Sequence, residues 1–296
     1  GFAAVRDQAA RTESAASDRA TQLAEVATDC ASCSAALRAV AAASDERLEA
    51  LGGLWDPWGG TPPEGASAPA AVSEAPTDVS AFVAWLARTA TRDLEIAADT
   101  NRTSTDEART LAAAALSRYS SAVTITQAYG IDLDAGLDQA LLINDRVNAA
   151  SRQGVQTWSI DLFDAPAISP SFAPSGKDLA SSQELSSAVA TWDCTASTLP
   201  QAQVSAGTLT DAYAVSGELL TRADTALRAG AADTRTPRCT LGFLDAPSLA
   251  SNLLAADSAM LASDSSDVRA AGASAALADI QQWAPRTPLP ALIGTR

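Results

Sequence analysis

Hydrophobic residues recur three or four positions apart along most of the chain, which is the spacing of one face of an α-helix packed against other helices. The pattern is most regular between residues 23 and 51, where Ser44 is the only clearly polar member. We therefore predict a buried helical face in this stretch. It carries two cysteines and comprises Leu23, Val26, Cys30, Cys33, Leu37, Val40, Ser44, Leu48 and Leu51.

Residues 3–22 have helical propensity but are polar, and only Val5 and scattered alanines are suited to burial. Joined to residues 23–52, they would form one helix of about 75 Å at 1.5 Å per residue. This length exceeds the expected width of a compact body of 296 residues. We expect either a break in this long N-terminal helix or a stalk at its start, and a stalk would lead to a membrane anchor upstream of residue 1.

Capping residues and helix breakers divide the remaining chain into further helices. Gly52 ends the first helix, Ser104 and Glu107 form a capping box, and Pro200 separates two helices. Ser265 caps the last helix. The predicted helices after the first span residues 78–99, 104–130, 134–152, 177–197, 201–229, 246–263 and 266–284.

The stretch 155–176 interrupts the helical pattern. Its first part alternates like a strand, and the prolines between residues 166 and 174 keep the remainder irregular. Because a lone strand has no partner, we predict an irregular crossover over the bundle surface. The predicted fold is all-α, with antiparallel helical bundles. Residues 1–130 form a long N-terminal helix plus a helical hairpin, and residues 131–296 form a second bundle.

Composition narrows the chemistry. The net charge of −15, from 35 acidic and 20 basic residues, repels phosphate backbones, so we expect no nucleic-acid partner. The chain has no histidine, which excludes Ser-His and Cys-His nucleophiles and nearly every usual zinc or iron site. We accordingly predict no catalytic residue, no cofactor and no metal site, and expect that the protein is not an enzyme.

The four cysteines, Cys30, Cys33, Cys194 and Cys239, are the main site candidates. A redox role for the first pair, a CxxC motif, needs a helix N-terminus, whereas helical sequence flanks this pair on both sides. A zinc site joining both pairs is a second alternative, although the spacing of the second pair is not that of a zinc knuckle. Two structural disulfides are the third and favoured alternative.

Local pairing of these cysteines is awkward on the predicted helices. A bond from Cys30 to Cys33 inside a helix would strain the geometry, and one from Cys194 to Cys239 would have to span a helix of about 40 Å. We therefore favour cross-pairing of Cys30 and Cys33 with Cys194 and Cys239. Stable disulfides indicate an oxidising, extracytoplasmic compartment.

Other candidates have a structural and a functional interpretation. Trp55 and Trp58 either form an aromatic ligand platform or cover the end of the bundle, and packing is favoured. Residues 132–138 lack the glycine and glutamate positions of a calcium loop, and Asn101 begins a glycosylation sequon. Two helical carboxylate pairs are favoured as solvated surface over a di-metal site: Glu46 with Glu49, and Glu95 with Asp99.

Four segments together show a family pattern: residues 48–53, 108–116, 137–142 and 268–290. Through these segments the chain resembles exported actinobacterial proteins that carry a ferritin-like domain of unknown function. The resemblance implies a ferritin-like four-helix bundle at residues 131–296, preceded by the long N-terminal helical region. Such domains often have Glu-His in the first bundle helix, where this chain has Asn144 and Asp145, so ferritin-type iron chemistry is not expected.

These observations lead to one functional hypothesis and one alternative. We expect an exported cell-envelope helical-bundle protein with a non-catalytic structural or protein-interaction role, bound to an envelope protein partner. Its expected location is extracytoplasmic, either secreted or membrane-anchored at the outer face of the cytoplasmic membrane. The alternative is a small-molecule or metal-binding bundle module without ferritin-type iron chemistry. The sequence does not predict the oligomeric state.

Overall fold

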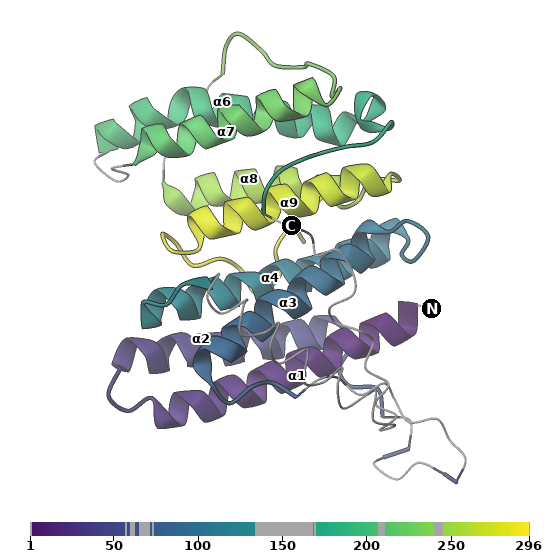
Figure 1. Cartoon of the computed structure of the whole chain (residues 1–296), viewed down its shortest axis with the longest axis vertical. Helices are drawn as coiled ribbons and strands as arrows, with labels where there is room; N and C mark the ends of the chain where they lie inside the picture. Colours follow the sequence, from purple (N-terminus) through teal and green to yellow (C-terminus); the bar gives the residue numbers. More distant parts are fainter. Residues whose placement is uncertain are drawn as a thin grey trace. The chain divides into compact units, whose positions relative to one another are not determined.

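The computed structural model describes residues 2–56, 58, 59, 63, 64, 72, 74–133, 168, 170–206, 211–239 and 245–295. Within these ranges the chain is helical and has no strand, which confirms the all-α prediction (Figure 1). The predicted helix at residues 134–152 and most of the predicted crossover at 155–176 lie outside the described residues. The helices are α1 (Phe2–Val26), α2 (Ala31–Ala50), α3 (Val79–Ala98), α4 (Thr105–Tyr129), α6 (Gln183–Ala206), α7 (Ala212–Arg228), α8 (Ala246–Met260) and α9 (Ser266–Trp283), with a 3-10 turn at Leu179–Ser181.

Two compact units interleave along the chain. Unit 1 contains residues 1–95, 114–167 and 290–292, and unit 2 contains residues 96–113, 168–289 and 293–296. Unit 2 thus contains the end of α3 from Ile96, the turn that follows it and the start of α4 up to Ala113, whereas the rest of both helices belongs to unit 1. These units do not follow the single boundary at residue 130 that the sequence predicted. Among the described helices, none has the length and apolar character that crossing a membrane requires.

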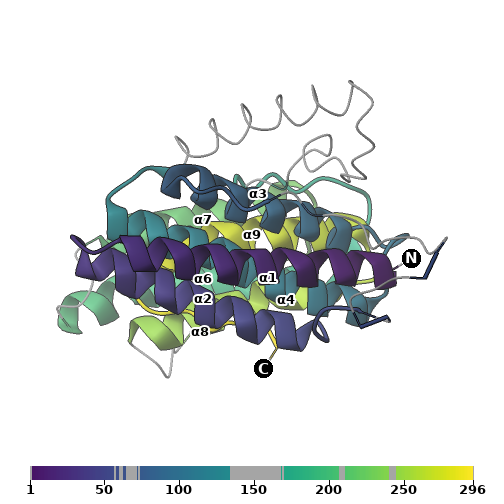
Figure 2. The same cartoon turned by 90° about the horizontal axis from the view of Figure 1, so that it is seen from below.

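Unit 1 begins with a hairpin of α1 and α2, which lie side by side in Figures 1 and 2. The helix predicted across residues 23–51 is therefore broken, because α1 ends at Val26 and α2 starts at Ala31. Val26 is 74% exposed and not part of a buried face, but Cys33, Leu37 and Val40 are buried as predicted. A hydrogen bond from the Ser34 hydroxyl to the Ala24 carbonyl (3.1 Å) closes the turn.

The polar start of α1 is buried, contrary to the sequence prediction. Gln8, Thr12 and Glu13 are all at most 2% exposed. A polar helix is expected to face solvent when its polar partners are unknown. The partners of these residues come from three other helices. One face of residues 3–22 thus belongs to the core of unit 1.

The start of α4 follows the predicted capping box. The Glu107 carboxylate accepts the Ser104 N–H (2.8 Å), and the Ser104 hydroxyl oxygen accepts the Glu107 N–H (3.4 Å). These two bonds satisfy N–H groups that a helix start leaves without partners. At the other end, Gly130 adopts a φ of +64°, a conformation that favours glycine and ends the helix.

Within unit 2, Arg269 of α9 holds the end of α3. Its guanidinium donates to the carbonyl oxygens of Ala97 and Thr103 (both 3.1 Å) and to that of Ser263 (2.5 Å). Arg269 is only 1% exposed. A cation at this position satisfies carbonyls that have no partner inside the helix and complements the negative end of the helix dipole.

The core of unit 2 lies between two helical hairpins, α6–α7 and α8–α9, with α6 packed on α8. Trp192 of α6 and Trp283 of α9 are its largest fully buried side chains. The helices α8 and α9 approach each other closely at Gly272. A Cβ atom there would lie 2.6 Å from the Met260 Cβ and 2.8 Å from the Asp257 carbonyl oxygen, so only glycine fits.

The helix α6 continues past Pro200 to Ala206, so the predicted break at this proline is wrong. Proline has no N–H, and the Ala196 carbonyl four residues earlier therefore lacks its normal helical partner. The Ser216 hydroxyl of α7 donates to this carbonyl at 2.5 Å. A neighbouring helix thus supplies the hydrogen bond that the proline removes.

We expect Ser216→Ala to lower the free energy of unfolding by about 1–3 kcal/mol, because it leaves the buried Ala196 carbonyl without a donor. Urea unfolding followed by circular dichroism measures the change. Thr221→Ala is the matched control, since Thr221 is exposed and its hydroxyl bonds only within its own helix. Equal effects of the two substitutions would contradict this role of Ser216.

Candidate functional site

The cysteines form two local disulfides, Cys30–Cys33 and Cys194–Cys239, with Cα–Cα distances of 5.2 and 5.5 Å. The cross-pairing favoured from the sequence is not what the structure shows. No cysteine is free. Two cysteine pairs at disulfide distance favour an oxidising, extracytoplasmic environment.

Both local pairings became available because the helices end elsewhere than predicted. Cys30 is the N-cap of α2 in an extended conformation, so Cys30 and Cys33 do not lie in mid-helix. The loop after α7 returns along α6, where the Thr234 hydroxyl donates to the Ser186 carbonyl (3.0 Å). This return brings Cys239 to Cys194 without spanning the full length of a helix.

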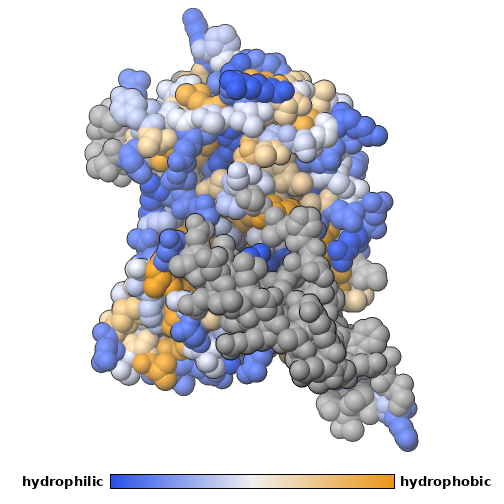
Figure 3. Space-filling model, viewed as in Figure 1, coloured by the Kyte–Doolittle hydropathy of each residue, from blue (hydrophilic) through white to orange (hydrophobic). Residues whose placement is uncertain are grey.

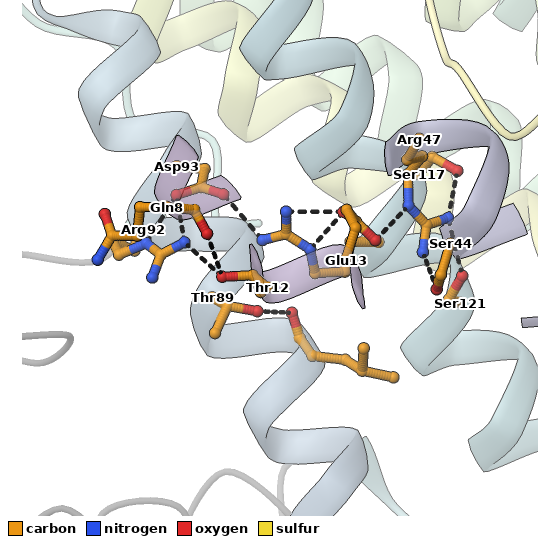
Figure 4. Close-up of polar contacts among 12 residues, drawn as sticks. Gln8, Thr12, Glu13, Ser44, Arg47, Thr89, Arg92, Asp93, Ser117 and Ser121 are labelled. Atoms are coloured by element: carbon orange, nitrogen blue, oxygen red, sulfur yellow. Dashed lines mark hydrogen bonds and ion pairs between the residues drawn. The ribbon is translucent and has the colours of Figure 1, made fainter. Parts of the chain in front are cut away.

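A network of five charged side chains crosses the core of unit 1 (Figure 4). Signs alternate along it, and its members come from α3, α4, α1 and α2. The distances between successive groups are 2.6–2.9 Å. In order, the members of this charged network are Arg92, Asp93, Arg118, Glu13 and Arg47.

Every carboxylate oxygen in this charged network is bound by a guanidinium group. Arg47 and Arg118 each take one oxygen of Glu13, at 2.9 and 2.7 Å. Arg92 and Arg118 each take one oxygen of Asp93, at 2.6 and 2.8 Å. These carboxylates therefore have no oxygen left without a cation, and guanidinium groups stand where a metal ion would need to bind.

Hydroxyl groups complete the coordination of Arg47. Its two terminal nitrogens donate to Ser44 (2.9 Å), Ser117 (3.0 Å) and Ser121 (3.3 Å). Arg47 and Glu13 have 0% exposed side chains, so solvent does not screen this pair. The polar residue that interrupts the hydrophobic face of α2, Ser44, is thus a ligand of the buried arginine.

Burial and pairing act in opposite directions on the pKa values of the residues in this charged network. Burial by itself would raise the pKa of Asp93, but attraction and hydrogen bonds from Arg92 and Arg118 outweigh it, so the pKa lies below its usual value. Burial would lower the pKa of Arg118, yet Glu13 and Asp93 raise it above its usual value. Asp93 and Arg118 thus favour each other's charged forms, whereas at Arg47 burial outweighs the attraction of Glu13 and lowers the pKa.

A second buried polar cluster lies in unit 2. Arg222 binds both oxygens of Asp279 (2.9 Å each), and its guanidinium stands 5.2 Å from the centre of the Trp192 ring. The Trp192 indole N–H donates to Asp257 (3.0 Å). Burial and the nearby, hydrogen-bonded Asp279 raise the pKa of Asp257 well above its usual value. Burial and Asp279 thus favour the protonated form of Asp257 beside the Arg222–Asp279 ion pair.

The remaining sequence candidates do not converge on a site. Trp55 is 53% exposed and stands edge-on to Trp58, with ring centres 5.7 Å apart. Trp55 therefore does not cover the bundle end in the way the packing interpretation requires. Among the described residues, no group of His, Cys, Asp or Glu could hold a metal ion. Other outcomes are simple: Glu46, Glu49 and Asn101 are exposed, Glu95 and Asp99 are half-buried, and most of 132–138 lies outside the described residues.

A shallow groove of about 390 Å³ lies between α6 and α8 in unit 2. Its floor is made by alanines of both helices, and Glu184, Thr191 and Asn252 provide polar groups along it. Its volume falls within the range of small-ligand sites. The buried charged clusters do not line it.

Sequence reasoning missed both buried clusters. Polar residues at helical spacing were interpreted as solvent-facing, because one sequence does not show which charged faces meet in the interior. Ser44 on an otherwise hydrophobic face was the one available signal.

Comparison of the chain with protein-family models, with curated proteins and with solved structures gave no match, so the function is inferred from the geometry of the chain itself.

Proposed function

We propose that this chain is an exported, extracytoplasmic helical-bundle protein with a structural or protein-binding role and no catalysis. The two disulfides support the location, and the resemblance to exported proteins with a ferritin-like domain agrees with it. The saturated carboxylates of the unit 1 core support a structural interior rather than a metal centre.

The observation that carries the binding role is the outer face of α7. Tyr213 is 74% exposed and Leu220 is 44% exposed, seven residues apart and therefore on the same face of the helix. Gly217 lies between them with nothing within 4 Å of an added Cβ, which leaves a flat site between the two side chains. In Figure 3 the face that includes the α6–α7 hairpin shows hydrophobic residues among hydrophilic ones.

Charge around this face indicates the kind of partner. The exposed residues Glu218 and Asp224 flank it, and Arg228 pairs with Asp224 (2.6 Å). A second copy of the chain would add another −15 to an already acidic surface. The face therefore suits a protein helix with apolar anchors bordered by arginine or lysine, rather than self-association.

The test is affinity capture from envelope fractions with the full chain and a Tyr213→Ser, Leu220→Ser double variant. We expect a stoichiometric, basic partner whose binding falls at least ten-fold in the double variant and weakens as salt is raised. Leu54→Ser is the control, because Leu54 is equally exposed (48%) but not part of α7. Binding that survives the double variant, or that Leu54→Ser also abolishes, would contradict the proposal.

The groove between α6 and α8 favours one alternative, a small-molecule-binding module. Native mass spectrometry of protein purified from its own host distinguishes the two. A bound molecule or metal ion at one equivalent, lost in Asn252→Leu, would replace the protein-binding proposal. A measured mass equal to that of the chain alone agrees with the protein-binding proposal.

A further inference from the structure

We propose that Cys30–Cys33 is a redox-active disulfide that exchanges with protein dithiols. This exchange is stoichiometric, one partner disulfide formed per chain, so it goes beyond the proposed binding role without making the chain a catalyst, and it does not use α7. A redox role is not expected of a cysteine pair inside a continuous helix. The structure instead places Cys30 at the N-cap of α2 and Cys33 in its first turn.

The two sulfur atoms have different environments, as an exchanging pair requires. Cys30 is half-exposed in the turn between α1 and α2, whereas Cys33 is 3% exposed. A partner sulfur can therefore reach Cys30 along the axis of the bond while Cys33 stays covered. Val26, 74% exposed at the end of α1, provides an apolar contact beside the turn.

Groups around Cys30 are arranged to hold a thiolate. The Cys33 N–H donates to the Cys30 sulfur at 3.2 Å, and the Ser32 hydroxyl lies 3.4 Å from it. Both bonds strengthen when the sulfur carries a negative charge, and the helix N-terminus adds its positive dipole end. The reduced form of Cys30 is stabilised as the nucleophile.

A separate observation concerns Cys33 and comes from another helix. Its sulfur lies 3.6 Å from the carbonyl oxygen of Ala128, in the last turn of α4. Carbonyls in a last turn have no partner within the helix. When the disulfide is reduced, the Cys33 thiol can donate to this oxygen. The buried cysteine thus has an acceptor in place for the proton that reduction delivers.

The exchange balances as follows. A partner thiolate attacks the Cys30 sulfur, the Cys30–Cys33 bond breaks, and its electron pair leaves on Cys33, which takes a proton. The second partner thiolate then attacks the partner sulfur of the mixed disulfide and releases Cys30 as a thiolate. The partner dithiol becomes a disulfide and loses two electrons, which Cys30 and Cys33 gain.

The second disulfide is an internal control. Cys194–Cys239 closes a sequence separation of 45 residues, whereas Cys30–Cys33 closes only three. Opening the smaller ring releases little chain, so the fold does not depend on it. We expect reduction of Cys30–Cys33 at a reduced-glutathione concentration at least ten-fold lower than Cys194–Cys239, with an unchanged circular dichroism spectrum.

Alkylation and peptide mapping of the full chain measure both bonds. Reduction of the two disulfides together, or reduction of Cys30–Cys33 only when the chain unfolds, would overturn the proposal. In the natively reduced chain, iodoacetamide should modify Cys30 at least ten-fold faster than Cys33. This second readout needs no substitution, so a variant that fails to fold does not prevent the test.

A peptide with two cysteines tests the exchange itself. One equivalent of the oxidised chain should consume two peptide thiols. In the reverse direction, with the peptide supplied as its disulfide, the Cys30 thiolate of Cys33→Ala should attack the peptide disulfide, form a mixed disulfide and release one peptide thiolate, whereas Cys30→Ala should react at least ten-fold more slowly. A reactive Cys30→Ala, or an inert wild-type chain, would refute the assignment. None of these readouts depends on the partner of α7, so the two proposals fail independently.

Discussion

Glu13→Gln should lower the free energy of unfolding by about 3–5 kcal/mol. The amide keeps the shape of the carboxylate but removes the negative charge between Arg47 and Arg118. Two buried guanidinium groups then face each other with only an amide oxygen between them, and neither has solvent to screen it. Urea unfolding gives the total change, and faster amide exchange in α1 and α2 locates it to unit 1.

Two comparisons separate this effect from a general loss of charge. Glu49→Gln removes an exposed carboxylate from α2 and should change stability by less than about 0.5 kcal/mol. The double variant Glu13→Leu, Arg47→Met removes one opposite-charge pair together and leaves Arg118 bound to Asp93, so it should recover part of the loss, since a buried ion pair replaced whole is often neutral. A stable Glu13→Gln chain would mean that solvent reaches this core.

Asp279→Asn and Asp257→Asn should differ sharply although the two residues are neighbours. Asp279 binds both terminal nitrogens of the buried Arg222, so its neutralisation leaves that cation unpaired and should cost about 3–5 kcal/mol. Burial and Asp279 favour the neutral form of Asp257, and asparagine can still accept the Trp192 N–H. Its substitution should change stability by no more than about 1 kcal/mol at pH 5.

The pH dependence gives the second readout for this pair. The pKa of Asp257 is higher in the folded chain than in the unfolded chain, where it is about 3.9. Its stabilising contribution is therefore complete below the unfolded value and is lost as pH rises through the folded value. Unfolding between pH 4 and 9 should show wild-type stability falling relative to Asp257→Asn. Parallel curves would contradict a protonated Asp257.

Helix faces and caps could be predicted from the sequence because their signals are local. The Ser104–Glu107 capping box and the buried run from Cys33 to Leu51 follow from residues a few positions apart. A break in the N-terminal helix was one of the two predicted alternatives, but its position at residues 27–30 was not predicted, since no glycine or proline marks it and alanine-rich sequence continues on both sides. A helix end of this kind depends on tertiary packing rather than on a breaker residue.

The polar contacts of the interior join residues that are far apart in the sequence, and the sequence pattern alone does not predict which of them meet. Glu13 meets Arg118 across 105 positions, and each residue alone resembles an ordinary surface charge. Pro200 shows the same limit from the other side, because the hydroxyl that allows α6 to continue belongs to Ser216 of another helix. The disulfide pairing failed for a related reason: it rested on helix ends that the chain does not have.

The Cys194–Cys239 bond also decides how this protein responds to force. When the chain is pulled from its two ends, the covalent bond transmits the tension directly, and α7 with both flanking loops lies outside the path of the pull. A separation of 45 residues, at about 3.5 Å each, corresponds to about 150 Å of contour that cannot extend while the bond is intact. Under such a pull, the face of α7 would keep its shape after neighbouring helices had begun to yield.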